Sequence, residues 1–407
     1  MKVFQINTVY NSGSTGRIVA DLKHLLEKNG NECFAAYGRG CSKEENTYCV
    51  SNKVDLYVHA MLTRLTDKTG FYSINSTKRL IKQIKRENPD IIHLHNIHGY
   101  YLNVEILFRF LKEYDRPVVW TFHDCWPYTG HCVHYGKYAR YELCDKWKTQ
   151  CEGCKRSVEY PSSWRDCSKW NYLHKKHAFT SLDKLHIVTV SGWLKNQVSQ
   201  SFLKNYPIHT IYNGIDLQKI GPVEDTDLRG KYELGEKKVV LGVANIWSPL
   251  KGVEDFVRLA DLLDGKNYQI VILGIDEKQK SILPPQILAL PRTESIGELA
   301  AWYSTAEVHY NASRAETFGM TVIEALACGT PVVTYNICAM SEILNEQCGF
   351  LVDRIGDVES AAERIILCSK EEMKTACIER SRAFEKEAQY MKYMELYNKI
   401  SNKTEKL

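Results

Sequence analysis

The feature that most constrains the fold is a repeated alternation of short apolar runs with segments whose apolar residues recur at helical spacing. Helical spacing marks, for example, residues 76–88 and 104–114. The apolar runs of strand length lie at 2–9, 32–38, 90–96, 117–124, 186–191, 208–216, 238–245, 268–274, 307–312 and 331–335. Strands separated by helices form parallel sheets whose two faces those helices cover. The sequence therefore predicts an α/β protein.

The alternation restarts after residues 207–216, and a chain of 407 residues exceeds what one hydrophobic core usually supports. We therefore expect two doubly wound, Rossmann-like parallel-sheet domains that face each other across a cleft. The expected parts are an N-terminal domain at 1–208, a second domain at 209–383 and a C-terminal helix at 384–407 that crosses back to the N-terminal domain.

Charge and hydropathy narrow the classes of function. A net charge of +4 is too small to argue for nucleic acid. No apolar run approaches the roughly 18 residues of a transmembrane helix, and residues 1–11 read as a strand rather than a signal peptide. We expect a cytoplasmic protein. The basic segment 78–87 is a candidate docking face for the inner side of the cytoplasmic membrane, although a solvated helix face is the more common meaning of such a run.

The stretch SRAETFGMTVIEALACGTPVV, residues 313–333, places two carboxylates, Glu316 and Glu324, after an expected strand. Ligands of parallel sheets bind beyond the carboxyl ends of the strands. Gly319 opens a helix there, and free amides at a helix start attract phosphate. Glu324 lies in an otherwise apolar run and needs donors such as ribose hydroxyls, while a sugar further out would meet Glu316. The alternative is that both glutamates face solvent.

This spacing of glutamates, followed by ALACGTPVV, resembles the retaining GT-B glycosyltransferases of family 4. The resemblance covers nearly the whole chain through NSGSTGRI, PDIIHLHNIHGYYLN, WTFHDCWPYTGHC, VTVSGWLKNQV, YNGID and VANIWSPLKG. These segments look like the branch that builds capsular, colanic-acid-like, lipopolysaccharide and other surface polysaccharides. The resemblance implies transfer of a sugar from a UDP- or GDP-sugar to a glycan or polyprenyl-linked glycan, with retention of anomeric configuration.

The resemblance also implies roles for particular residues. Glu324 would bind the ribose, and Glu316 would contact the donor sugar and stabilise positive charge at the anomeric carbon. Lys251 would bring a cation to the diphosphate, so that catalysis needs no metal or other cofactor. The full donor-binding set is Lys251, Gly252, Phe318, Gly319, Met320, Thr321 and Glu324, joined from the N-terminal half by Gly13, Gly16 and Arg17.

Histidines supply the remaining candidates of the N-terminal half. His123 ends an expected strand, and the resemblance implies that it lies near the reacting sugar as a catalytic residue. The alternative is a structural histidine paired with Asp124. His95 and Asn96 are candidate acceptor contacts, and the spacing of His93 and His95 on a strand points both to one face.

The chain departs from the family pattern at two places. Residues 243–247, VANIW, lack the arginine that usually precedes the Lys-Gly pair, and residues 336–342, NICAMSE, lack the usual Gly-Gly loop, although Glu342 remains. Two other functions therefore stay open: a nucleotide-sugar epimerase on the same fold, and a non-catalytic sugar-binding or scaffold subunit.

Six of the fourteen cysteines fall within residues 125–167, which we interpret as a Cys-rich insertion of the N-terminal domain. Without a secretion signal, disulfides are not the default. Cys132, Cys144, Cys151 and Cys154 include a Cys-x2-Cys pair and are candidate ligands of a structural zinc. Reduced thiols without a metal are the equal alternative.

Overall fold

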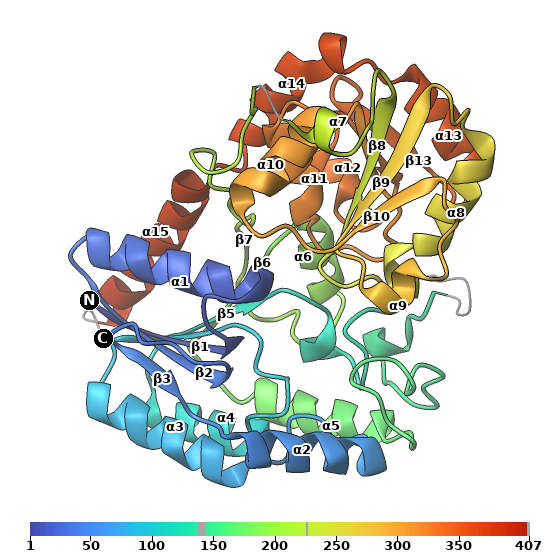
Figure 1. The fold of residues 1–407 in the computed structure, drawn as a ribbon. Coiled ribbons are helices and arrows are strands. Elements are labelled where there is room, and N and C mark those ends of the chain that lie inside the picture. Colours follow the sequence, from blue (N-terminus) through green and yellow to red (C-terminus); the bar gives the residue numbers. More distant parts are fainter. Residues whose placement is uncertain (137–142, 225–226, 405–407) are drawn as a thin grey trace. The chain divides into compact units, whose positions relative to one another are not determined.

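The computed structural model describes residues 1–136, 143–224 and 227–404, without the side chains of 402–404. The chain divides into two compact units. Of the described residues, unit 1 contains Met1–Gly136, 143–212 and the segment that begins at Gln389, and unit 2 contains 213–224 and 227–388. Each unit is a parallel α/β layer structure (Figure 1). The predicted α/β class with two parallel-sheet domains is therefore confirmed.

Unit 1 is built on a seven-stranded sheet in the order β3-β2-β1-β4-β5-β6-β7. Its strands pair in parallel, with Val3 of β1 opposite Cys33 of β2 and Ile91 of β4. The strands are β1 Lys2–Val9, β2 Glu32–Arg39, β3 Thr47–Cys49, β4 Ile91–Leu94, β5 Val118–Phe122, β6 Leu185–Thr189 and β7 Ile208–Thr210. The helices are α1 Gly13–Lys28, α2 Lys53–Thr66, α3 Ile74–Glu87, α4 Val104–Tyr114, α5 Ser168–Phe179, α6 Gly192–Val198 and α15 Lys386–Thr404, with short 3-10 turns η1 Trp126–Tyr128 and η2 Lys146–Lys148.

The sheet of unit 1 lies between two helical layers (Figure 1). Helices α1 and α15 share one face, where buried residues of both helices pack on β1, β4, β5 and β6. Helices α2, α3, α4 and α5 lie on the other face. Tyr390, Tyr393 and Tyr397 of α15 are at most 2% exposed and belong to the first of these packing layers. The body of α15 is therefore part of the core of unit 1.

Unit 2 contains a six-stranded parallel sheet in the order β10-β9-β8-β11-β12-β13. Its strands are β8 Lys238–Val243, β9 Tyr268–Leu273, β10 Ile287–Leu290, β11 Val308–Asn311, β12 Val332–Tyr335 and β13 Gly349–Val352. Its helices are α7 Leu228–Lys231, α8 Val253–Leu262, α9 Glu277–Lys280, α10 Ile296–Thr305, α11 Met320–Ala327, α12 Met340–Ile343, α13 Val358–Leu367 and α14 Lys370–Arg382, with the 3-10 turn η3 Pro249–Lys251.

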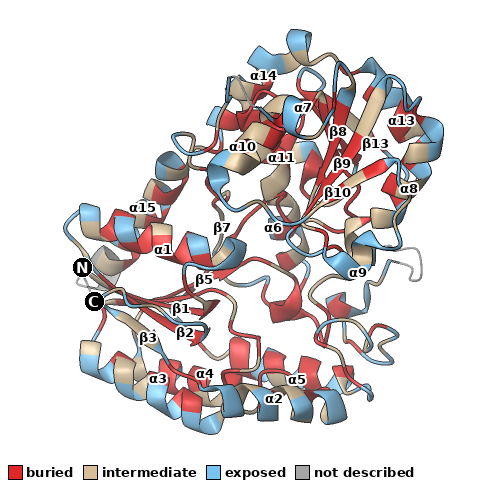
Figure 2. Ribbon diagram, in the orientation of Figure 1, coloured by how far each residue is buried: buried red, intermediate tan, exposed pale blue. Residues whose placement is uncertain are grey.

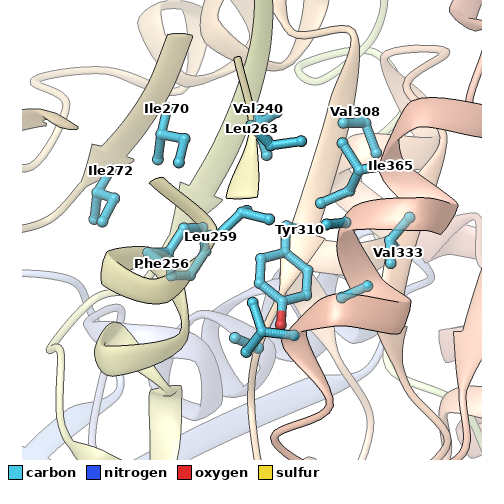
Figure 3. Close-up of a cluster of buried hydrophobic side chains, with 14 of the residues drawn as sticks. Val240, Phe256, Leu259, Leu263, Ile270, Ile272, Val308, Tyr310, Val333 and Ile365 are labelled. Atoms are coloured by element: carbon cyan, nitrogen blue, oxygen red, sulfur yellow. The ribbon is translucent and has the colours of Figure 1, made fainter. Parts of the chain in front are cut away.

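A continuous apolar core fixes α8 and α13 to one face of this second sheet. Phe256 and Leu259 of α8 and Ile365 of α13 pack against strand residues that include Val240, Ile272, Val308 and Val333 (Figure 3). These residues are between 0% and 1% exposed. Burial of this kind contributes about 25 cal/mol for each Å² of apolar surface removed from water, so the core holds the strand ends and their loops in place.

The glycine-containing segment that follows β1 is helical, since residues 13–17 form the first turn of α1. The expected C-terminal helix is α15, which begins at Lys386, after α14 has ended at Arg382. Among the described residues, no helix combines the length and the apolar character needed to cross a bilayer.

Candidate active site

The candidate donor site lies where the strand order of unit 2 reverses. β8 and β11 are neighbours at the centre of the sheet, but the chain continues from β8 towards β9 and from β11 towards β12. Loops that leave such a switch point diverge and create a binding crevice at the carboxyl edge. Lys251 follows β8, and the segment from Ser313 to Gly319 follows β11. The topology therefore brings together two segments that the sequence separates by about 60 residues.

Lys251 and Glu316 meet in this crevice. The Lys251 ammonium nitrogen lies 2.7 Å from a carboxylate oxygen of Glu316 and 3.4 Å from the hydroxyl of Ser313. The two loops are also joined by their backbones, because the Arg314 amide donates to the carbonyl of Leu250 at 2.8 Å. The side chains of Lys251 and Glu316 are 34% and 18% exposed, so a ligand can reach the pair.

Two glycines allow these loops their close approach. Gly252 has φ 68°, and a Cβ there would collide with the carbonyl oxygen of Ala312. Gly319 has φ 97° and directly precedes α11; a Cβ there would lie 2.6 Å from Cε of Met340. Both conformations lie in the left-handed region that side chains disfavour. The backbone at these two positions therefore requires glycine.

The remaining candidates of the motif occupy the start of α11. Phe318 is 2% exposed and packs edge-on against Phe384, with ring centroids 5.8 Å apart. Met320 and Thr321 are half-buried in the first turn. Phe318 therefore anchors the turn, while Met320 and Thr321 stand where a helix start presents its amides.

Glu324 is half-buried on α11 and has a partner that the sequence did not suggest. The hydroxyl of Tyr303 donates to a carboxylate oxygen of Glu324 at 3.1 Å. Burial, together with the charge of Glu324, raises the pKa of Tyr303 well above its ordinary value, so the phenol remains a donor. This contact offsets the cost of a carboxylate beside apolar residues.

A guanidinium does lie beside the Lys-Gly turn, although it comes from an unexpected place in the sequence. Arg314 is 9% exposed, and its Nη1 is among the atoms that a Cβ on Gly252 would meet. Its other terminal nitrogen lies 2.8 Å from Asp255, which also accepts a hydrogen bond from Tyr335 at 2.6 Å. The ion pair with Asp255 balances the charge of Arg314, so Lys251 is the more accessible of these two cations.

The loop that lacks the Gly-Gly pair still adopts a glycine-like backbone. Cys338 has φ 47°, in the left-handed region. Burial raises the pKa of its thiol to about 11, and the backbone of Glu316 is among its hydrogen-bonding partners. Glu342 lies in α12, where Arg380 donates to the carbonyls of Glu342 and Ile343. The loop therefore reaches the candidate site without its usual residues.

In unit 1 the strand order reverses between β1 and β4, and the other candidates gather at that carboxyl edge. His123 follows β5, and its ring nitrogen lies 3.1 Å from that of His95. His95 is 1% exposed, and its second nitrogen lies 3.1 Å from the side-chain oxygen of Gln5. The His93 and His95 ring centroids are 4.0 Å apart, as expected for one face of a strand. His95 is thus placed to hold the ring of His123, and its role as an acceptor contact stays a prediction.

Burial keeps these histidines neutral. It lowers the pKa of His123 to about 4 and that of His93 to about 3. The Asp124 carboxylate lies 2.8 Å from a ring nitrogen of His98, which reaches it from the loop after β4. The charge of Asp124 also acts on His123, so the alternative in which Asp124 pairs with His123 stays open. Asn96 is half-buried, and its backbone amide donates to the side-chain oxygen of Asn7 at 3.1 Å.

The last three candidates, Gly13, Gly16 and Arg17, lie at the start of α1. Gly13 is the first residue of the helix, with φ 63° and open space around the position of a Cβ. Arg17 is exposed, and its Nε donates to the carbonyl of Gly13 at 3.2 Å. An exposed cation one turn into a helix lies close to the amides that attract anions. The group follows β1, at the same edge as His95 and His123.

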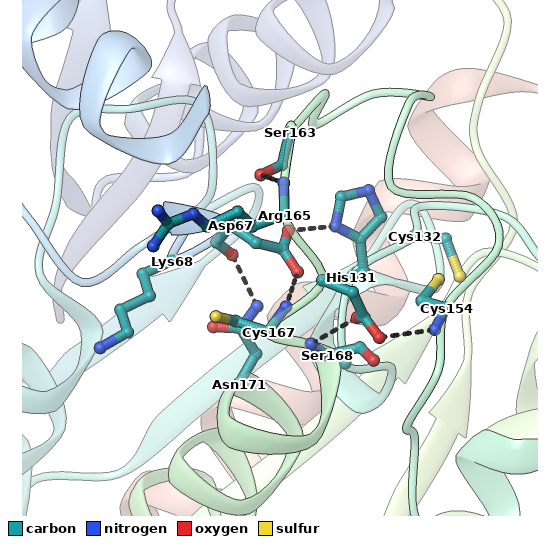
Figure 4. Close-up of polar contacts among 12 residues, drawn as sticks. Asp67, Lys68, His131, Cys132, Cys154, Ser163, Arg165, Cys167, Ser168 and Asn171 are labelled. Atoms are coloured by element: carbon teal, nitrogen blue, oxygen red, sulfur yellow. Dashed lines mark hydrogen bonds and ion pairs between the residues drawn. The ribbon is translucent and has the colours of Figure 1, made fainter. Parts of the chain in front are cut away.

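The Cys-rich insertion is organised by hydrogen bonds around Asp67. This buried carboxylate contacts the ring of His131 and accepts from the amide of Cys167 at 2.8 Å (Figure 4). Burial and the neighbouring thiols raise the pKa of Cys132 well above its ordinary value. Among the described residues, no group of three or more His, Cys, Asp or Glu side chains is arranged to hold a metal ion. The structure therefore does not support the zinc set, which stays a prediction for metal analysis to test.

Comparison with solved structures identifies the class of fold. The chain is similar to sucrose-phosphate synthase from Thermosynechococcus elongatus, with a TM-score of 0.71, 17% identity and coverage of 98% and 99% of the two chains. It is also similar to Anabaena HepE in complex with UDP-glucose, with a TM-score of 0.67, 15% identity and full coverage of both chains. Two parallel-sheet units of this kind define a GT-B glycosyltransferase fold.

The sequence comparisons give the family. The model described as Glycosyltransferase Family 4 matches residues 15–219, just over half of the chain, and the model described as Glycosyl transferases group 1 matches residues 224–389. The protein belongs to glycosyltransferase family 4. It is 23% identical over 398 residues to WcaC of Escherichia coli K12, named as a colanic acid biosynthesis glycosyl transferase, with 92% of each chain covered. CapM of Staphylococcus aureus, named as a capsular polysaccharide biosynthesis glycosyltransferase, is 27% identical over 210 residues, 48% of this chain and 54% of CapM.

Proposed function

We propose that this glycosyltransferase moves a sugar from a nucleotide-sugar donor to a glycan acceptor in surface polysaccharide biosynthesis, with retention of anomeric configuration. The observation that carries the proposal is the contact of Lys251 with Glu316 at the switch point of unit 2, next to helix α11, whose second turn carries Glu324. One cation and two carboxylates there suit the three parts of a nucleotide sugar: diphosphate, sugar and ribose. The names of WcaC, CapM and the UDP-glucose complex of HepE favour the same class of donor and pathway.

The proposed reaction needs only groups of this chain and the substrates. Lys251 and the first amides of α11 stabilise negative charge on the diphosphate as the bond from the anomeric carbon to the phosphate oxygen breaks. Glu316 stabilises positive charge on the sugar. The acceptor hydroxyl forms the new bond to the same carbon from the same face, and its proton passes to the departing phosphate oxygen. His123 is proposed to contact sugar hydroxyls.

The proposed acceptor is a lipid-linked glycan at the inner face of the cytoplasmic membrane. A cytoplasmic placement agrees with the cysteines, since all fourteen are free thiols in the structure and thiols persist in reducing compartments. The donor is a UDP- or GDP-sugar in this proposal, and the amides of α11 with Lys251 serve either diphosphate equally.

Release of nucleoside diphosphate tests this proposal. UDP- and GDP-sugars are incubated with the protein, with and without lipid-linked glycans extracted from bacterial membranes, and free UDP or GDP is measured. We expect acceptor-dependent release by the wild type and little release by Glu316→Gln. Conversion of the donor sugar without any acceptor would favour the epimerase instead. Donor binding without release under any condition would favour the scaffold subunit.

A further inference from the structure

Helix α2, Lys53–Thr66, carries its apolar residues on the outside. Val54, Tyr57, Val58, Met61 and Leu65 are 70%, 77%, 45%, 58% and 41% exposed. Their spacing of three and four residues places them in one stripe along the helix. A surface helix normally turns such a stripe towards the core. The residues of α2 that are buried, His59 and Thr63, are polar. Figure 2 shows α2 at the outer surface of unit 1.

Polar contacts on the inner side fix this orientation. The ring of His59 bonds on one side to the hydroxyl of Ser73 at 2.7 Å and on the other to the amide of Gly70 at 3.1 Å. Asp55 accepts from Ser76 at 2.8 Å and from Arg79 at 2.6 Å. Rotating the apolar stripe inwards would turn Asp55 and His59 out to solvent and leave the buried hydroxyl of Ser76 and the buried amide of Gly70 without these partners. The inner contacts of α2 therefore hold the apolar stripe on the outer surface of unit 1.

The charges beside the stripe are positive. The other exposed residues of α2 are Lys53 and Arg64. The carboxylate of α2, Asp55, is paired with Arg79, and Asp67, which follows the helix, is buried. The neighbouring helix α3 exposes Lys78 and Lys82, for which the structure shows no ion pair among the described residues. An apolar stripe flanked by cations without exposed carboxylates complements an anionic lipid surface.

An aromatic residue completes the pattern. Trp164 is 72% exposed and lies at the end of α2, where its amide donates to the carbonyl of Arg64 at 2.8 Å. The Arg64 guanidinium lies 5.6 Å from the centroid of the Trp164 ring. Tryptophan and tyrosine gather at the headgroup level of membranes because one end of each is apolar and the other polar. Trp164 lies at the C-terminal end of the exposed stripe, and Tyr57 lies within its N-terminal half.

We propose that α2 and Trp164 form the surface by which unit 1 binds an anionic phospholipid bilayer. The side chains of Val54, Val58, Met61 and Leu65 enter the boundary between headgroups and acyl chains, and the flanking cations meet the anionic headgroups. The helix lies in the plane of the interface and does not cross it. This inference rests on the proposed function, because a lipid-linked acceptor would be bound at the membrane surface. Its evidence is the exposed stripe of α2. It replaces the basic segment 78–87 as the docking face and gives its lysines a flanking role.

Vesicle co-sedimentation of the full chain tests the proposal. The probes are vesicles of phosphatidylglycerol mixed with phosphatidylcholine, and vesicles of phosphatidylcholine alone. The test variant is Val58→Ser with Met61→Ser. The control is Ile366→Ser with Leu367→Ser on α13 of unit 2, whose side chains are 54% and 62% exposed. Because all four side chains are exposed, both variants should fold, which circular dichroism checks.

We expect the wild type and the α13 control to bind the anionic vesicles, more weakly as salt rises, and the α2 variant to bind at least tenfold more weakly. The α2 variant should keep the thermal response to nucleotides, so a failure of the membrane site is distinct from a failure of the donor site. Equal vesicle binding by wild type and α2 variant would overturn the proposal. So would concentration-dependent dimers that the α2 variant abolishes without any vesicle binding by the wild type, since the stripe would then join two copies.

Discussion

Lys251 and Glu316 approach to 2.7 Å although they follow different strands, β8 and β11, and belong to loops joined by a backbone hydrogen bond between Arg314 and Leu250. The pair places a cation and a carboxylate at the central switch point of the second sheet. A donor with a diphosphate and a sugar requires both charges, the first for its leaving group and the second for its anomeric carbon.

Glu316→Gln should lower the rate of transfer by about 10² to 10³, the cost typical of removing one electrostatic contact to a transition state. The amide keeps the shape of the side chain but not its charge. Donor affinity should change much less than the turnover rate, since the charge on the sugar develops only in the transition state. Steady-state kinetics measures the turnover rate and the KM, with the donor whose nucleotide raises the melting temperature of the wild type. A loss confined to KM would contradict the role given to Glu316.

Lys251→Ala should weaken donor affinity as well as turnover, because the ammonium is expected to contact the diphosphate in both ground and transition states. Lys251→Arg preserves the charge, although not the geometry of a compact ammonium, and should recover part of the affinity. Titration with the nucleoside diphosphate alone isolates the binding step. If Lys251→Ala binds the nucleotide as tightly as the wild type does, Lys251 does not contact the diphosphate.

Gly319→Ala should destabilise unit 2 by about 1 kcal/mol or more, the usual cost of a side chain in the left-handed region. The new Cβ would also lie 2.6 Å from Met340. Gly297→Ala is the matched control, since its Cβ would meet only Ser295 at 3.8 Å in helix α10, where alanine is favoured over glycine by about 0.5–1 kcal/mol. Thermal melting should move in opposite directions for the two variants. Equal shifts would remove the argument from the backbone of Gly319.

The protein should lose stability as the pH falls below about 6.5, the pKa of histidine in an unfolded chain. Burial lowers the pKa of His59 and His93 to about 3 and that of His123 and His309 to about 4. Below about pH 6.5 the unfolded chain gains protons that the folded chain does not. This contribution to stability is complete above about pH 6.5, is lost progressively as the pH falls below that value, and is fully lost once the pH has passed the folded-state pKa values of about 4 and about 3.

Thermal melting at about pH 7.5 and about pH 5.5 checks this sign, because carboxylates with lowered pKa values, such as Glu44 and Asp55, titrate further down. The melting temperature should be lower at the acidic pH. His177→Gln, which changes an exposed histidine, should leave the difference intact. A melting temperature that does not change between the two pH values would show that the four histidines are not held neutral.

The sequence predicts the parallel sheets because continuous apolar runs such as those of β1, β5 and β8 are buried on both faces. It does not predict β3, a three-residue edge strand whose residues are all partly exposed. The outward orientation of helix α2 is not predicted for a different reason. The spacing of its apolar residues indicates a helix but does not show whether the apolar stripe faces inwards or outwards. Only the contacts of His59 and Asp55 with residues 73–79 show that it faces out.

The candidate site divides in the same way. Glu316, Gly319 and Glu324 stand close together in the sequence, so their pattern shows there. Tyr303 and Asp255, which hold Glu324 and Arg314, lie 21 and 59 residues away from them along the chain. Such contacts depend on which strands become neighbours, which a local pattern does not record. Arg314 was within the motif, two residues before Glu316, but only the fold shows that it lies next to Gly252.

Thermal melting with UDP, GDP and ADP and their sugars is the measurement that tests the central claim most directly. It compares the wild type with Glu324→Gln and with the control Glu363→Gln, which changes an exposed glutamate of α13. One nucleotide should raise the melting temperature of the wild type and the control by several degrees through mass action, and Glu324→Gln should lose that rise. A wild type that responds to no nucleotide, or a Glu324→Gln variant that responds as the wild type does, would contradict a nucleotide-sugar site at this edge of unit 2.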